Sequence, residues 1–332
     1  MPIPLRTSAF WSVYRLIDRT PVMQQPAATV RAKSDLRKRV LRLPGAQLIT
    51  GRPDASVAFT DTQLRLDDGT ELPLRVYRPR DAGGERLPVV VYFHGGGWVS
   101  GDPRQSEWWC AGVAAGAHLA VVSVDYRLAP EHPFPTPAED CYAATCWVAE
   151  HAAQLDIDDT RLAVMGDSAG GNLAAVVCVM ARDRRAPAVA LQVLIYPSVA
   201  IGADFPSGRE NANAPILTSK DVDNTPRLYL LGTNADPKDP YASPLYADHH
   251  DLPPALIQTA QFDPLRDHGA AYAAALRDAG VDARLTNYVD AVHGYASLPG
   301  IVPVARQALA EAVDEFRNRL CGPDFPAKRA FE

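Results

Sequence analysis

The sequence has few cysteines, no surplus of positive charge and no long hydrophobic run, and each of these deficits excludes a class of protein. Its five cysteines among 332 residues show neither disulfide-framework nor metal-ligand spacing, which fits a reducing compartment and predicts a cytoplasmic location and no bound metal. A net charge of −6 without a dense basic patch argues against nucleic acid as a partner. What the sequence does have is 47% hydrophobic residues, enough to fill a large core.

The best candidate for a membrane or targeting segment lies at residues 9–17. Arg15, Asp18 and Arg19 interrupt it within one helical length, so it is too short to span a bilayer and does not resemble a cleaved signal peptide. Its apolar side chains fall on one face of a helix: Phe10, Val13, Tyr14 and Ile17. We expect this amphipathic helix to pack on the body of the protein; contact with a membrane surface is the alternative.

Strand-like and helix-like segments alternate along most of the chain. Apolar runs typical of parallel strands covered on both faces recur at 87–93, 119–124, 161–165, 189–196 and 255–260, and a further strand is expected at 283–289. Before them, a turn at residues 67–70 joins 64–66 to 72–76 in an antiparallel hairpin. The pattern predicts a mostly parallel α/β sheet with an antiparallel start.

The expected helices lie between these strands. One begins at the capping pattern Thr136-Pro137-Ala138-Glu139 and runs to about residue 152, another covers 265–279 before Gly280, and the last covers about 303–320. Residues 1–45 look helical as well. Residues 198–235 are instead broken by glycine, asparagine and proline, and a stretch of that length in a compact domain is usually functional, often a lid. Without repeats or linkers, a single domain over residues 1–332 is expected.

The segment Gly166-Asp167-Ser168-Ala169-Gly170 joins an apolar strand to an alanine-rich helix. A strand that reverses into a helix must turn sharply at Ser168, and the two glycines remove side chains that would collide there. This predicts a nucleophile elbow, with the serine hydroxyl at the apex of the turn. The alternative, a Gly/Ser turn that merely ends a strand, is weakened by the strand-then-helix context and by a second motif.

That second motif is His94-Gly95-Gly96-Gly97-Trp98, directly after the strand at 87–93. Consecutive glycines leave backbone N–H groups unhindered, so they can point at a developing negative charge. In lipases and esterases such a loop forms one half of the oxyanion hole, and the N–H after the nucleophile forms the other. The predicted donors are Gly96, Gly97 and Ala169. The loop lacks the Lys-Ser/Thr ending of a P-loop and the spacing of a dinucleotide fingerprint, so no cofactor is expected.

A serine nucleophile needs a general base, and the base needs an acid that orients it. In the chain order that accompanies this elbow, the acid and then the histidine follow later strands. Asp263 follows the run at 255–260, and His293 follows the strand at 283–289. We therefore expect His293 to take the proton of Ser168 and Asp263 to hold the His293 tautomer.

Other acidic residues and histidines compete with this assignment. Asp267, one helical turn further on, is the alternative acid, and Asp290 is expected to shape its loop. Asp167 is expected to hydrogen-bond the elbow rather than to exchange protons, and His94 to anchor the glycine loop. The remaining histidines considered are expected to be structural or solvent-facing: His132, His249, His250 and His268.

Five motifs together resemble the hormone-sensitive-lipase family of α/β-hydrolase esterases: HGGGW at 94–98, YRLAPEHPFP at 126–135, GDSAGGNLA at 166–174, DPLRD at 263–267 and HGY at 293–295. The resemblance covers the chain from about residue 70, without the first 50 residues and 198–235. It implies an α/β-hydrolase fold with helices on both faces of the sheet and a mostly helical cap formed by 1–45 and 198–235.

The resemblance also implies a serine carboxylesterase that hydrolyses small esters with short to medium acyl chains, through an acyl intermediate on Ser168. Trp98 and Tyr295, where relatives commonly carry Phe, are expected to alter the shape of the pocket, and Trp98, Tyr196 and Leu265 are candidates for lining it. An amide, aryl formamide or acetyl-metabolite hydrolase with the same triad stays open. A non-catalytic receptor is disfavoured because such receptors have lost the histidine. The sequence leaves a homodimer open.

Overall fold

The computed structural model describes residues 45–322 together with Thr29, Ala32, Leu36 and Arg39. The helix expected at 9–17 and the N-terminal part of the expected cap therefore lie outside the described residues, those four apart. The described strands are β1 (Val57–Arg65), β2 (Glu71–Pro79), β3 (Leu87–Phe93), β4 (Ala120–Val124), β5 (Ile157–Asp167), β6 (Leu191–Ile195), β7 (Ala255–Phe262) and β8 (Ala283–Val292). The described α-helices are α3 (Gln47–Thr50), α4 (Glu107–Ala117), α5 (Thr136–Glu150), α6 (Ala169–Arg184), α7 (Pro206–Glu210), α8 (Ser219–Tyr229), α9 (Arg266–Asp278) and α10 (Val304–Phe316).

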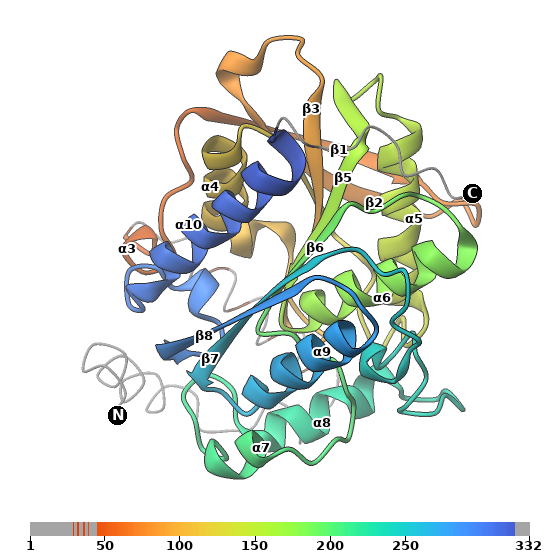
Figure 1. The fold of residues 1–332 in the computed structure, drawn as a ribbon, viewed down its shortest axis with the longest axis vertical. Coiled ribbons are helices and arrows are strands. Elements are labelled where there is room, and N and C mark those ends of the chain that lie inside the picture. Colours follow the sequence, from red (N-terminus) through yellow and green to blue (C-terminus); the bar gives the residue numbers. More distant parts are fainter. Residues whose placement is uncertain (1–28, 30–31, 33–35, 37–38, 40–44, 323–332) are drawn as a thin grey trace.

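The described strands form one sheet of eight in the order β1-β2-β4-β3-β5-β6-β7-β8 (Figure 1). The predicted hairpin is present, since Leu64 pairs with Leu72 in an antiparallel ladder. β2 pairs antiparallel with β4, and every pairing from β4 to β8 is parallel. The prediction of a mostly parallel sheet with an antiparallel start is confirmed.

Helices cover both faces of the sheet, with α4 and α10 on one face and α5, α6 and α9 on the other (Figure 1). The sequence of β3 is continuously apolar because both faces of the strand are covered by helices. Val89 and Val91 pack in the core under α5 and α6, whereas Val90 and Tyr92 pack in the core under α4 and α10. All seven residues of β3 are buried, as expected of a central parallel strand.

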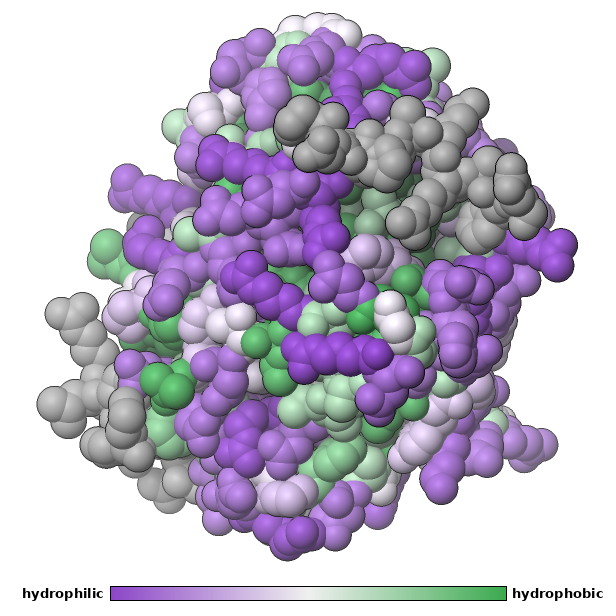
Figure 2. Space-filling view, viewed as in Figure 1, coloured by the Kyte–Doolittle hydropathy of each residue, from purple (hydrophilic) through white to green (hydrophobic). Residues whose placement is uncertain are grey.

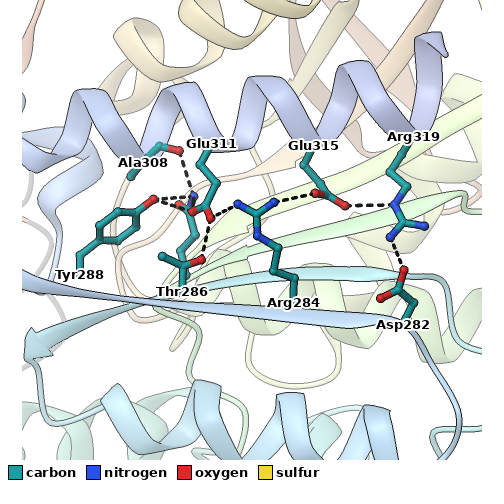
Figure 3. Close-up of polar contacts among 9 residues, drawn as sticks. Asp282, Arg284, Thr286, Tyr288, Ala308, Glu311, Glu315 and Arg319 are labelled. Atoms are coloured by element: carbon teal, nitrogen blue, oxygen red, sulfur yellow. Dashed lines mark hydrogen bonds and ion pairs between the residues drawn. The ribbon is translucent and has the colours of Figure 1, made fainter.

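α10 is tied to the edge of the sheet by a polar network (Figure 3). The carboxylate of Glu311 accepts hydrogen bonds from Thr286 Oγ1 at 2.6 Å, Tyr288 Oη at 2.5 Å and Gln258 Nε2 at 2.8 Å. Ion pairs continue this network between α10 and β8 and on to the residues just outside them, in the order Glu311, Arg284, Glu315, Arg319 and Asp282. The network fixes β7 and β8, the two strands whose ends carry Asp263 and His293, against one helix.

One helix prediction needs correction. The helix at Thr136 starts as expected, but its capping box is wrong: Pro135 occupies the N-cap position and no side-chain cap hydrogen bond forms. The chain already turns one residue earlier, where the Thr136 N–H donates to Pro133 O, so Thr136 becomes the first helical residue. Residues 198–235, expected to be part of a mostly helical cap, contain α7 and α8. A capping box between Thr218 and Asp221 starts α8, and Pro226 lies inside it.

The molecular face in Figure 2 carries hydrophilic residues over most of its area, with hydrophobic residues scattered between them. Among the residues described, none of the helices combines the length and the apolar character that crossing a membrane requires.

Candidate active site

Ser168 lies at the sharp turn between β5 and α6, with φ 56° and ψ −116°. A non-glycine residue adopts such a backbone only under strain, which is usual at functional sites. Glycine is required on both sides of it. A Cβ at Gly166 would lie 2.1 Å from Gly170 O, and a Cβ at Gly170 would lie 2.0 Å from Phe93 O. The elbow therefore depends on close backbone contact between β5, α6 and the end of β3.

The structure brings Ser168, Asp263 and His293 together from three loops. His293 Nε2 lies 2.9 Å from Ser168 Oγ, and His293 Nδ1 lies 2.7 Å from Asp263 Oδ2. The Asp263 side chain is fully buried, and its other oxygen accepts the Leu265 N–H at 2.8 Å. These loops follow β5, β7 and β8, whose carboxyl ends meet at one edge of the parallel sheet.

The two rival acids lie elsewhere. Asp267 accepts the Ser207 N–H at 2.8 Å and pairs with Arg266 at 2.9 Å, so its carboxylate faces α7 rather than the histidine. Asp290 is exposed on β8. Of these three carboxylates, it is Asp263 that lies within hydrogen-bond distance of His293.

The glycine loop adopts backbone conformations that favour glycine. Gly96 and Gly97 have φ values of 128° and 64°, and a Cβ at Gly96 would lie 2.1 Å from Ser100 O. Ala169 is the first residue of α6, so its N–H has no partner within the helix. Over residues 45–322, the N–H groups of Gly96, Gly97 and Ala169 donate to no other residue. All three remain available to an oxyanion.

Asp167 connects the elbow to the glycine loop. Its Oδ1 accepts the Gly95 N–H at 2.7 Å and the Tyr92 hydroxyl at 2.5 Å, and the Tyr196 hydroxyl lies 3.4 Å from Oδ2. Burial raises the pKa of Asp167, and these hydrogen bonds partly oppose that shift. Asp167 was expected to hydrogen-bond the elbow. Instead, its carboxylate accepts a hydrogen bond from Gly95, 72 residues away in sequence, and so joins the elbow to the glycine loop.

His94 is fully buried and stacks on Tyr126, with ring centroids 4.3 Å apart. The Tyr126 hydroxyl donates to His94 O at 2.7 Å, and His94 Nδ1 lies 2.9 Å from Gly95 O. These contacts are those of an anchor for the glycine loop.

α7 and the residues after it contact the loop that carries the acid. Ser207 Oγ donates to Pro264 O at 2.7 Å, and the Ser207 N–H donates to Asp267. Asn211 Nδ2 donates to the backbone oxygen of Asp263 at 3.2 Å. No sequence motif marked Ser207 or Asn211, because their partners are backbone atoms more than 50 residues away.

α8 contacts the glycine loop. Tyr229 at its C-terminal end stacks on Trp98 with centroids 4.6 Å apart and meets the edge of Phe134 at 5.7 Å. A Cβ at Gly97 would lie 2.2 Å from Thr225 Cγ2, so Thr225 lies directly against the loop. The capping pattern at Thr218 was the sequence signal that could have revealed α8.

The three pocket candidates are almost completely buried. Trp98 is covered by Tyr229, Tyr196 packs on the His293 ring at 4.7 Å, and Leu265 holds Asp263 through its N–H. Their exposed fractions are 2%, 1% and 3%. They pack on or bond the residues of the candidate site and of α8, and their contact with substrate stays a prediction.

The other histidines named in the sequence analysis make contacts outside the group of Ser168, His293 and Asp263. His268 is buried in α9 against Phe205, and burial lowers its pKa to about 4. His249 is buried with its Nε2 3.0 Å from Pro244 O, whereas His132 and His250 are exposed. No cluster of potential metal ligands occurs among the described residues.

An elbow serine, a histidine–aspartate pair and free N–H groups at the carboxyl edge of a parallel sheet define a serine hydrolase of the α/β class. The family profile described as alpha/beta hydrolase fold matches residues 90–297, and the chain belongs to that family, in its hormone-sensitive-lipase-like branch. It is a carboxylic ester hydrolase.

Named relatives agree with this assignment. The chain is 44% identical over 308 residues to carboxylesterase NlhH of Mycobacterium tuberculosis, covering 92% of this chain and 94% of NlhH. It is 46% identical to esterase LipI of the same organism over 77% of this chain and 81% of LipI. The structure resembles a hyperthermophilic esterase from Pyrobaculum calidifontis with a TM-score of 0.86 and 38% identity, over 96% of this chain and 99% of the other.

Proposed function

We propose that this ester hydrolase cleaves short- to medium-chain carboxylic esters through an acyl intermediate on Ser168. The observation that carries the proposal is the continuous contact from Ser168 Oγ through His293 to Asp263, at 2.9 and 2.7 Å. These are the distances at which a base can take the hydroxyl proton and an acid can fix the tautomer of the base.

In the proposed reaction, His293 Nε2 takes the proton of Ser168 as Oγ attacks the ester carbonyl. The carbonyl oxygen gains negative charge and is stabilised by the N–H groups of Gly96, Gly97 and Ala169. His293 then gives the proton to the leaving alcohol. Water, deprotonated by the same imidazole, attacks the acyl–Ser168 ester, and the acid is released. Asp263 stabilises the imidazolium in both halves.

The preference for short to medium acyl chains rests on the cap and on one relative. α7 and α8, within residues 198–235, hydrogen-bond or pack against the acid loop and the glycine loop, so we expect this segment to limit the length of the acyl chain. A relative from Pseudomonas putida that is 35% identical over 82% of this chain is named ethyl acetate hydrolase, which acts on a small ester.

We further propose a single domain over residues 1–332, with residues 198–235 as part of its cap.

The experiment is hydrolysis of p-nitrophenyl acetate, butyrate, octanoate and dodecanoate by wild type and by Ser168→Ala. We expect kcat/KM to be highest for acetate or butyrate and to fall towards dodecanoate, and we expect Ser168→Ala to lose turnover. Turnover that survives in Ser168→Ala would reject Ser168 as the nucleophile. A higher kcat/KM for dodecanoate would reject the proposed preference for short to medium acyl chains. Faster cleavage of aryl amides or formamides than of matched esters would identify an amide hydrolase.

We also propose a cytoplasmic location, because all five cysteines are free and three of them, Cys110, Cys141 and Cys178, are buried. Fractionation of the native cells would test it. A homodimer remains a prediction, to be tested by light scattering of the purified protein.

A further inference from the structure

The turn between α7 and α8 contains a strained residue. Ile216 has φ 71°, although β-branched side chains rarely adopt positive φ. The Leu217 N–H donates to Pro215 O at 2.8 Å, which closes a three-residue γ-turn around Ile216 in its strained form. The surrounding structure must hold this turn in place, and strain of this kind gathers at functional sites.

The strained turn meets the loop that carries the general base. A Cβ at Gly294, the residue after His293, would lie 3.5 Å from Ile216 Cγ2, which is ordinary van der Waals contact. Ile216 is only partly buried, so part of its side chain is not covered by protein among the described residues.

Both ends of the turn are anchored. On the N-terminal side, Asn211 bonds the backbone of Asp263. On the C-terminal side, Thr218 starts α8 with a capping box, and Ser219 Oγ donates to Gly208 O. Hydrogen bonds on both sides of the turn therefore hold Ile216 against Gly294, the residue that follows His293.

The chemistry of the site decides which part of a substrate would meet Ile216. The carbonyl oxygen must point at the N–H groups of Gly96, Gly97 and Ala169, because the negative charge develops there. The leaving alcohol must lie within hydrogen-bond reach of His293 Nε2, because it receives the proton from that atom. A side chain packed against Gly294, next to His293 in the chain, is therefore in position to border the alcohol.

We propose that Ile216 is a specificity-determining residue that limits the size of the alcohol portion of the ester, with the strained turn as the device that holds it there. The inference rests on the proposed function, since it needs an acyl–Ser168 reaction with a leaving alcohol. It differs from the chain-length proposal because it concerns the other half of the substrate.

The test compares methyl butyrate with cyclohexyl and benzyl butyrate in a pH-stat assay, for wild type, Ile216→Val and Ile216→Ala. One methylene in an apolar pocket changes selectivity by about 10- to 200-fold, so Ile216→Ala should raise the kcat/KM ratio of bulky to methyl ester by at least about tenfold. Ile216→Val should give a smaller change in the same direction. The acyl-chain profile on p-nitrophenyl esters should stay that of the wild type.

Leu231→Ala is the matched control, because Leu231 is a cap residue that is 54% exposed. It should leave both profiles unchanged. Should Ile216→Ala fail to fold, as judged by circular dichroism, Ile216→Val decides the question alone. An unchanged alcohol ratio, or a change confined to the acyl-chain profile, overturns the inference while the esterase function stands. Absence of ester hydrolysis by wild type would reject the proposed function itself.

Discussion

Gly170 is the position where the elbow helix and the glycine loop come closest. In a Gly170→Ala variant, the new Cβ would lie 2.0 Å from Phe93 O and 2.7 Å from His94 O, both of them backbone atoms. Ordinary contact begins at 3.4 Å, so α6 and the end of β3 must separate by about 1.4 Å, the difference between the two distances. Those segments carry Ala169 on one side and Gly96 and Gly97 on the other.

The expected cost in activity follows from that displacement. A misplacement of about 1 Å costs on the order of 10²-fold, so kcat of Gly170→Ala should fall at least about 100-fold. Overpacking should also lower the free energy of unfolding by about 1–3 kcal/mol. The assay is kcat on p-nitrophenyl butyrate together with urea unfolding.

Gly112→Ala separates activity from stability. Gly112 lies on α4, and its new Cβ would lie 2.6 Å from Leu309 Cδ2, the flexible end of a side chain of α10. We expect a loss of stability with kcat close to that of wild type. A folded Gly170→Ala enzyme with wild-type kcat would refute the view that the spacing between elbow and glycine loop sets the rate.

Three further substitutions test the site, its pH response and its support. Asp167→Ala removes the acceptor for the Gly95 N–H and should lower kcat by up to about 10²-fold with little change in KM, whereas Asp167→Asn should keep most of the rate. Burial lowers the pKa of His268 to about 4 from its ordinary 6.5, so the unfolded chain takes up the proton first as pH falls. The free energy of unfolding therefore decreases as the pH falls from 6.5 towards 4, by about 2 kcal/mol between pH 7 and 5. Urea unfolding of the His268→Phe variant should not show this part of the decrease. Glu311→Ala removes the half-buried carboxylate that accepts from Gln258 and Tyr288, so thermal and urea unfolding should show a loss of about 1–3 kcal/mol. An unchanged stability would mean that the network in Figure 3 does not hold α10 to the sheet.

Sequence reasoning succeeded where one local pattern decides the structure. The run at 87–93 is β3 to the residue, because a strand buried on both faces must be continuously apolar. The elbow was predictable because Gly166 is required by a backbone contact with Gly170, only four residues further along the chain. That Asp263 and His293 lie close to Ser168 was predictable because parallel strands bring their carboxyl ends to one edge of the sheet.

The remainder of the site depends on contacts that no local pattern encodes. Asp167 binds Gly95, which is 72 residues away, and nothing in either segment specifies that partner. The capping box at Thr136 failed because the preceding turn moved the helix start by one residue. The positive φ of Ile216 contradicts the preference of its residue type, so only the tertiary contacts that hold the turn explain it.

The central claim is that Ser168 carries the acyl group. Its most direct test is to treat the enzyme with an activated alkyl phosphonate ester, which leaves a stable phosphonyl adduct on a nucleophilic serine, and to locate the adduct by peptide mass spectrometry. The account predicts an adduct on Ser168 with matching loss of esterase activity, slow labelling in His293→Ala and no labelling in Ser168→Ala. Inactivation with the adduct on another residue, or full activity with Ser168 blocked, would contradict it.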